Sequence, residues 1–130
     1  MDYLAFYNKV MFHKPRSTND KERFKARVLE WAEKMNVSVS SLAVRAMRRK
    51  WASCSKRGNL VFNQELLPLS ADIADYVIVH ELLHFSVPNH GKLWKSLMRA
   101  HLGDYEHLEQ ALRSRASSVD LVNPVCGKPV

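Results

Sequence analysis

The chain has 130 residues, of which 46% are hydrophobic and 25% charged, and this length and composition suit one globular domain. No run of about 18 apolar residues and no basic-then-apolar leader occurs, so we expect neither a membrane-spanning helix nor a secretion signal. The net charge of +7 suggests contact with nucleic acid, nucleotides or acidic proteins without selecting among them. The two cysteines, Cys54 and Cys126, give poor evidence for a disulfide, and a reducing cytoplasm is the expected location.

The first predicted helix runs from about Asn19 to Asn36, after an apolar stretch and a loop within residues 1–18. Apolar side chains recur in it at steps of three and four residues, and basic side chains populate its other faces. We therefore expect a helix that packs on the core and exposes a basic back; its apolar stripe comprises Phe24, Val28, Trp31, Ala32 and Met35.

Two strands are predicted next. Residues 39–47 alternate loosely and are rich in β-branched side chains, and residues 60–63 form a short apolar run. Residues 56–59, with the sequence KRGN, are a turn signal between them. We expect the two strands to pair as a hairpin, in which Cys54 is a small packing residue.

A second helix is predicted over residues 71–86. Ser70 is a suitable N-cap, and apolar residues then recur at the spacing of a largely buried helix. Pro88 prevents continuation and biases Val87 away from helical angles.

This helix carries the sequence His80-Glu81-Leu82-Leu83-His84. His80 and His84 stand four residues apart, so their imidazoles share one helix face and can reach one metal ion. Glu81 lies beside them and can act on a water at the metal, as in the H-E-x-x-H pattern of zinc proteases. A set of unrelated histidines is the alternative, but it leaves ionisable groups unexplained in a very apolar segment.

The best third ligand is His90, because Pro88 and Asn89 end the helix and can turn the chain back. The spacing from His84 equals that of metzincins, but Val87 stands where metzincins have a glycine, so we expect a different turn. Glu106 or Glu109 as third ligand is the alternative.

Two further helices are predicted, over residues 90–102 and from Asp104 to about residue 113, separated by Gly103. Periodicity is lost from residue 114 on. The sequence thus predicts one α+β domain over residues 1–113 and a flexible tail over residues 114–130.

Several blocks within about residues 42–112 carry a resemblance to a known family, namely residues 49–55 (RKWASCS), 58–60 (GNL), 75–84 (DYVIVHELLH), 89–90 (NH) and Trp94. They resemble the YgjP-like metallopeptidase family and, more distantly, the SprT-like metallopeptidases. The resemblance implies a small zincin-like fold, one zinc ion held by His80, His84 and His90, and Glu81 as the base. The chain departs from the family at Lys50 and at Ala52, where the family has glycine, and it lacks much of the N-terminal strand-rich part.

The expected function is hydrolysis of peptide bonds in a peptide or protein substrate, with water activated by zinc and Glu81 as general base. An edge strand near residues 60–63 would hold the peptide by strand addition. Candidate substrate-binding residues are Arg48, Arg49 and Asn63; candidates for stabilising the oxyanion are His101, Tyr105 and residues 48–50.

Two other functions remain open at this point. The basic residues near the motif would also suit a nucleotide phosphate, which would make the protein a metal-dependent phosphohydrolase. A non-enzymatic, zinc-stabilised basic domain that binds nucleic acid or protein is the other alternative.

Overall fold

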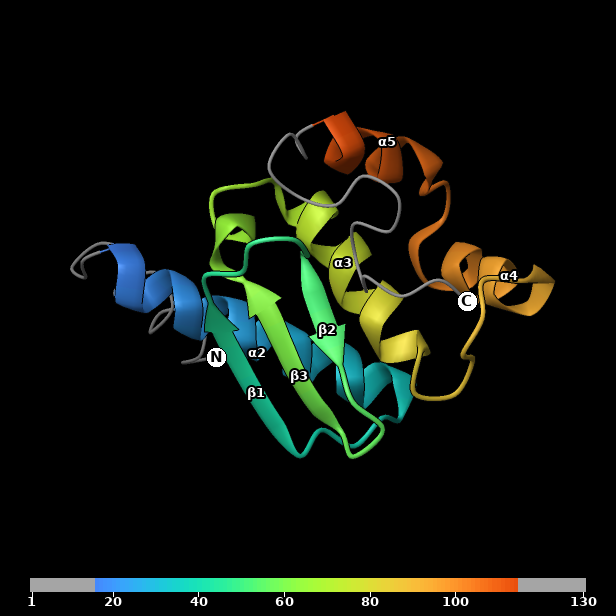
Figure 1. The fold of residues 1–130 in the computed structure, drawn as a ribbon. Coiled ribbons are helices and arrows are strands. Elements are labelled where there is room, and N and C mark those ends of the chain that lie inside the picture. The colour runs from blue at the N-terminus through green and yellow to red at the C-terminus, as the bar shows by residue number, and fades with distance from the viewer. Residues whose placement is uncertain (1–15, 115–130) are drawn as a thin grey trace, which may run out of the picture.

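The computed structural model describes residues 16–114, which form a small α+β fold (Figure 1). Its elements in chain order are α2 Arg16–Met35, β1 Ser41–Arg45, β2 Ala52–Cys54, β3 Asn59–Asn63, the 3-10 turn η1 Gln64–Leu66, α3 Ala71–Leu83, α4 Lys92–Leu102 and α5 Glu106–Ser114. The predicted class and the sequence of helix, sheet and three helices are confirmed. Most of the predicted N-terminal stretch, and the tail beyond Ser114, lie outside the described residues.

The sheet has the strand order β1-β3-β2 and corrects the predicted pairing. β1 lies parallel to β3, with Ser41 opposite Asn59, so the expected hairpin between residues 39–47 and 60–63 is wrong. The hairpin partner of β3 is β2, which pairs with it antiparallel. The strand β2 has only three residues, ASC, which is too short for a period and contains no strong strand former.

The expectation that residues 60–63 form an edge strand is also wrong, because β3 is the central strand. A strand paired on both sides has no free backbone groups with which to hold a peptide. Among residues 16–114, the edges of the sheet are β1 and β2, and β2 is the edge that contacts α3.

The helix α2 lies behind the sheet in Figure 1 and contacts β1 and α3. Phe24, Val28 and Ala32 of the predicted stripe are buried, and Phe24 meets Phe62 of β3 edge to face, with 5.2 Å between ring centroids. The helix ends because Asn36 adopts a positive φ of 60°, which lets Val37 N–H donate to the Ala32 carbonyl at 2.8 Å.

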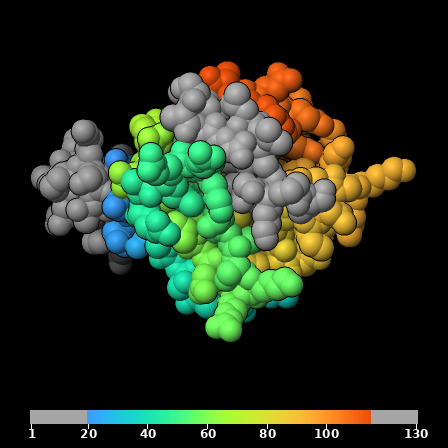
Figure 2. Space-filling view, in the orientation of Figure 1, coloured from blue at the N-terminus to red at the C-terminus, as the bar shows by residue number. Residues whose placement is uncertain are grey.

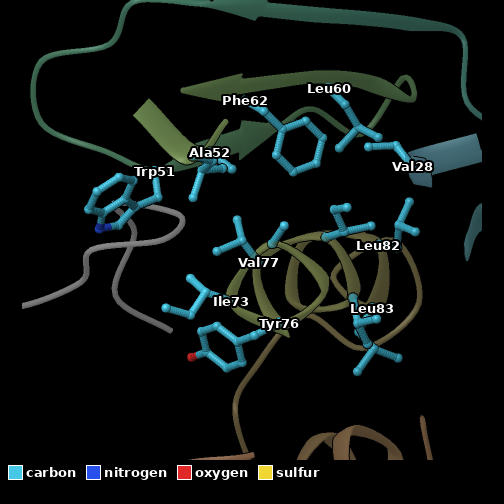
Figure 3. Packing of buried hydrophobic residues seen from close by; sticks show 14 of the residues in the cluster. Val28, Trp51, Ala52, Leu60, Phe62, Ile73, Tyr76, Val77, Leu82 and Leu83 are labelled. Atoms are coloured by element: carbon cyan, nitrogen blue, oxygen red, sulfur yellow. The ribbon is translucent and has the colours of Figure 1, made fainter. Parts of the chain in front are cut away.

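The helix α3 is the centre of the fold, and it contacts α2, β2, α4 and α5. Ten of its thirteen residues are buried, so it has no solvent face, unlike the amphipathic α4 and α5. Figure 3 shows Ala52, Leu60 and Phe62 of the sheet pointing toward Val77 and Leu82 of α3. A polar side chain on the buried surface of α3 is therefore surrounded by the core and needs a polar partner there.

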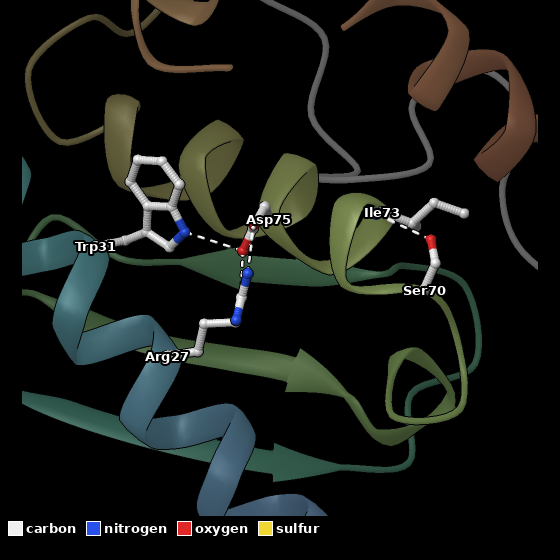
Figure 4. A network of polar contacts seen from close by, with 5 residues as sticks. All are labelled: Arg27, Trp31, Ser70, Ile73 and Asp75. Atoms are coloured by element: carbon white, nitrogen blue, oxygen red, sulfur yellow. Dashed lines mark hydrogen bonds and ion pairs between the residues drawn. The ribbon is translucent and has the colours of Figure 1, made fainter. Parts of the chain in front are cut away.

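Polar contacts fix where α3 begins and how it sits on α2 (Figure 4). The Ser70 hydroxyl accepts from Ile73 N–H at 3.4 Å, which confirms the predicted N-cap. The Asp75 carboxylate accepts from the Arg27 guanidinium, with a distance of 2.8 Å to Oδ2, and from Trp31 Nε1 at 2.9 Å. Among residues 16–114 no helix combines the length and the apolarity needed to cross a membrane.

Candidate metal centre

The end of α3 and the loop after it bring three imidazoles together. The helix ends at Leu83, three residues earlier than predicted, and His84 is its C-cap. The chain then turns tightly, with Val87 N–H donating to the Leu83 carbonyl at 2.7 Å, and α4 begins only at Lys92. His90 therefore lies in the loop, where it is free of helical geometry and folds back toward His84.

The three rings form a compact triangle. Their centroids are 4.9 Å apart for His80 and His84, 4.9 Å for His80 and His90, and 4.8 Å for His84 and His90. One ring nitrogen from each lies within 4.8 Å of the others, and Nε2 of His84 is 3.1 Å from Nε2 of His90. Three nitrogens converging in this way suit a single small cation, since zinc lies about 2.0–2.1 Å from each imidazole nitrogen.

The protonation of the cluster also suits a metal. Burial lowers the pKa of His80 well below its usual value, and the nearby His84 and His90 lower it further. Burial and His90 lower the pKa of His84 to about 4, against a smaller opposing effect of the Val87 backbone. Burial lowers the pKa of His90 as well. All three imidazoles are thus neutral near pH 7, which is the form that binds metal.

His80 provides the test of whether a metal fits. Its side chain is 4% exposed, and neither ring nitrogen has a hydrogen-bond partner within the part of the chain that the structure describes. Leaving a buried polar group unsatisfied costs about 1–3 kcal/mol. Coordination by one nitrogen would remove part of this cost, and the donor set of three imidazoles is one that catalytic zinc uses.

Aromatic rings surround His80 and hold the triangle in place. Trp94 of α4 is 5% exposed, and its ring centroid lies 4.9 Å from that of His80 and 4.5 Å from that of His90. Tyr76, one turn before His80 on α3, lies 5.7 Å from it and stacks on Tyr105 at 6.2 Å. From the sequence, Trp94 was one of the residues that carry the family resemblance and Tyr105 was an oxyanion candidate, but neither was predicted to pack beside the histidines. The spacing of Tyr76 four residues before His80 was the signal for its position.

Glu81 is next to His80 on α3 and is fully buried, at 0% exposure. It does not belong to the group of converging ligand atoms, which contains the three histidines only. A carboxylate beside three converging imidazoles but outside their group can act on a water there.

The carboxylates considered as alternative ligands are used elsewhere. Glu106 pairs with Arg99, and Glu109 with Arg113 at 3.2 Å. Neither joins the ligand group, although the charge of Glu109 raises the pKa of His90 against the larger effect of burial. Among residues 16–114, the structure gathers the histidine set and not the glutamate alternative.

The other predicted site residues lie outside the histidine triangle. Arg48 and Arg49 are exposed. Asn63 is 1% exposed; its amide donates to the carbonyls of Met47, at 3.1 Å, and Lys50, at 2.9 Å, and it accepts from Glu65 N–H. These contacts hold the β1–β2 loop and cap η1.

The two oxyanion candidates on the later helices differ in their surroundings. The ring of His101 faces Trp31, with 6.1 Å between centroids, so it is turned to α2. Tyr105 is 2% exposed and its ring lies edge-on to Trp94 at 6.1 Å. Of the two, only Tyr105 packs on rings that themselves contact the histidines.

A cleft of about 1000 Å³ opens beside the triangle. His84 and Ser86 line one part of it, and Ser53, Cys54 and Ser55 at the end of β2 line another. The edge strand β2 and His84 of the histidine triangle thus line one cavity.

A buried histidine triangle, a glutamate beside it on the same helix and an adjoining cleft define a metallohydrolase site, and the comparisons agree. The family of YgjP-like metallopeptidase domains matches this chain over residues 8–115, so the chain belongs to that family and is a metallopeptidase. The family favours this class over a phosphohydrolase or a non-enzymatic basic domain.

Solved structures show the same fold. The metallopeptidase zymogen of Methanocaldococcus jannaschii jannalysin aligns with a TM-score of 0.64 and 25% identity, covering 71% of this chain and 95% of that one. The metallopeptidase zymogen of Pyrococcus abyssi abylysin aligns with a TM-score of 0.64 and 13% identity, covering 78% and 98%. These likenesses confirm the predicted zincin-like fold. No curated protein sequence matches the chain.

Proposed function

We propose that the protein is a zinc-dependent peptidase of the cytoplasm, with one zinc ion held by His80, His84 and His90 and with Glu81 as general base. The observation that carries the proposal is His80, a deeply buried imidazole whose two nitrogens have no hydrogen-bond partner among the described residues and whose neighbours are two more neutral imidazoles. A metal ion explains all three at once.

Zinc bound there would supply a Lewis acid and would lower the pKa of a coordinated water to about 7. The three histidines hold it while neutral, and the rings of Trp94 and Tyr76 keep the imidazoles from rotating away. Glu81 accepts the proton of the attacking water and later donates it to the leaving amine. Its burial excludes bulk water, which strengthens its electrostatic interactions with the reacting atoms.

The strand β2 takes the peptide-binding role that the sequence analysis gave to residues 60–63. The Trp51 carbonyl accepts from Asn63 N–H at 2.9 Å, and Ser55 N–H donates to the Asn59 carbonyl at 3.0 Å, so both residues turn their backbone toward β3. Because this direction alternates along an antiparallel strand, Ala52 and Cys54 turn theirs away from β3. A peptide would lie along this edge strand, in the cleft that His84 also lines.

Replacing Glu81 by Gln tests the function. The amide keeps the size of the side chain but cannot take a proton, so we expect zinc content to stay at wild-type level. Hydrolysis of casein and of a mixed peptide library should fall by a factor of about 10² to 10⁴.

Two results would contradict the proposal. One is wild-type peptide hydrolysis in the Glu81→Gln protein, which would remove the base. The other is hydrolysis of nucleoside triphosphates, but of no peptide, by the zinc-loaded wild-type protein, which would assign a different reaction.

A further inference from the structure

The third histidine of the triangle differs from the other two in what holds it. His80 lies on α3 and His84 is the C-cap of that helix, so the helix backbone fixes both. His90 lies in the loop before α4, and within residues 16–114 neither it nor the two residues before it form a backbone hydrogen bond. The position of the His90 ring therefore depends on side-chain contacts.

One of these contacts is with His84. The Nε2 atoms of the two rings are 3.1 Å apart, which is the distance of a hydrogen bond. An imidazole nitrogen that binds a metal ion carries no proton, so this hydrogen bond is lost when both nitrogens bind the ion. It competes with metal binding and cannot be what keeps His90 in a loaded site.

Trp94 supplies a contact that does not compete. Its ring centroid lies 4.5 Å from that of His90, 4.9 Å from that of His80 and 6.4 Å from that of His84. The indole thus meets all three imidazoles and lies nearest to the one that the helix backbone does not hold. Ring packing uses no lone pair of an imidazole nitrogen, so it is compatible with a bound metal ion.

The packing of α4 fixes Trp94 in turn. Trp94 is 5% exposed, whereas the neighbouring Leu93 is 62% exposed, and orange side chains of this helix project at the right of the molecule in Figure 2. The indole also meets the ring of Tyr105 edge-on, with 6.1 Å between centroids. It is therefore a rigid surface against which the His90 ring can rest.

The indole N–H of Trp94 is buried and has no hydrogen-bond partner in the described part of the chain. A buried indole usually donates a hydrogen bond, and a bond left unmade lowers stability. An aliphatic side chain would avoid this cost. What the indole supplies at this position is its broad, flat ring beside the imidazoles.

We propose that Trp94 is a positioning residue that holds His90 in the metal site and thereby sets the affinity for the ion. The inference rests on the proposed zinc site of His80, His84 and His90. In this arrangement α3 holds two ligands directly, and α4 holds the third through Trp94.

The dissociation constant for zinc, measured by competition with a chelating indicator, tests this role without a substrate. Trp94→Leu should weaken zinc binding about 10- to 100-fold, the usual effect of removing a residue that orients a metal ligand. Trp94→Phe keeps an aromatic ring and should retain most of the wild-type affinity. Trp94→Met serves the same comparison should the leucine variant not fold.

The variant His90→Ala separates positioning from general damage to the fold. In that background Trp94→Leu has no third ligand left to position, so it should change zinc affinity by a much smaller factor than it does in the wild type. An equal factor in the two backgrounds would overturn the proposal, because the indole would then act independently of His90.

The matched control is Trp51→Leu. Trp51 is also buried, at 2% exposure, and its indole N–H also lacks a partner within residues 16–114, but it lies directly before β2 and makes no ring contact with a histidine there. This control should lower the free energy of unfolding and leave zinc affinity near the wild-type value. A loss of affinity as large as that of Trp94→Leu would contradict the specific role of Trp94.

Urea unfolding of each metal-free variant shows whether it is folded. Unchanged zinc affinity in a folded Trp94→Leu protein would overturn the role of Trp94 and leave the zinc site standing. Failure of the zinc site itself has a different signature, which is a wild-type protein that binds no zinc or a His90→Ala protein that binds it equally well.

Discussion

The burial of His80 is the residue-scale feature on which the site depends. An imidazole at 4% exposure with no hydrogen-bond partner among the described residues would destabilise an ordinary core. In this protein the ring centroids of His84 and His90 both lie 4.9 Å from that of His80, and the rings of Trp94 and Tyr76 meet it edge to face. Keeping three neutral imidazoles together therefore lowers the stability of the metal-free fold.

This cost predicts how the metal-free protein responds to pH. The pKa of His84 is lowered from its ordinary value of 6.5 to about 4, so between these values the unfolded chain binds more protons than the folded one. The contribution of His84 is thus fully favourable above about pH 6.5 and is lost as the pH falls toward 4. The free energy of unfolding, measured with urea in the presence of a chelator, should be lower at about pH 5 than at about pH 7.5.

The variant His84→Asn isolates this effect, because carboxylates elsewhere also contribute to acid destabilisation. Its unfolding free energy should change less between the two pH values than that of the wild type. An equal or larger change in the variant would show that His84 is not held neutral by the fold.

At the scale of elements, α3 positions the site and is itself positioned by α2. The side chain of Asp75 on α3 is 14% exposed, and it contacts Arg27 and Trp31 of α2 (Figure 4). A partly buried carboxylate that satisfies two donors on another helix fixes how the two helices pack.

Replacing Asp75 by Ala should therefore destabilise the protein by about 2 kcal/mol in urea unfolding, because it leaves the indole N–H and the guanidinium without their acceptor. Asp20→Ala is the control, since it breaks an ion pair of 3.1 Å with Arg23 within one helix on the surface. That change should cost less than about 1 kcal/mol. An equal loss of unfolding free energy in the two variants would mean that the contacts of Asp75 with α2 stabilise the protein no more than a surface ion pair does.

The elements also show what the sequence could predict. The helices α2 and α3 were predicted correctly to within a few residues, because their signals are local. These signals are the spacing of apolar residues in both helices and the N-cap Ser70 of α3. The strand β2 could not be found in this way, because Ala52, Ser53 and Cys54 become a strand only through their partners on β3. The parallel pairing of β1 is a tertiary property for the same reason, and the error in the edge strand followed from it.

For the site, the sequence predicted which residues converge but not what surrounds them. His80, His84 and His90 were found from spacing and from Pro88, and the structure brings all three together. The roles of Trp94 and Tyr76 beside the rings depend on how α3 and α4 pack, which spacing does not contain. The cleft joins residues from β2, the turn after it and the end of α2, so only the folded chain shows it.

At the scale of the whole molecule, the described residues combine a histidine triangle, an edge strand and a cleft. The central claim is that one zinc ion is held by three imidazoles, two from α3 and one from the loop after it. Zinc K-edge X-ray absorption of the zinc-loaded protein tests this claim directly. We predict three imidazole nitrogens at about 2.0–2.1 Å with one further oxygen, and the loss of one imidazole in His90→Ala. A sulfur ligand, fewer than three imidazoles, or a spectrum that His90→Ala leaves unchanged would contradict it.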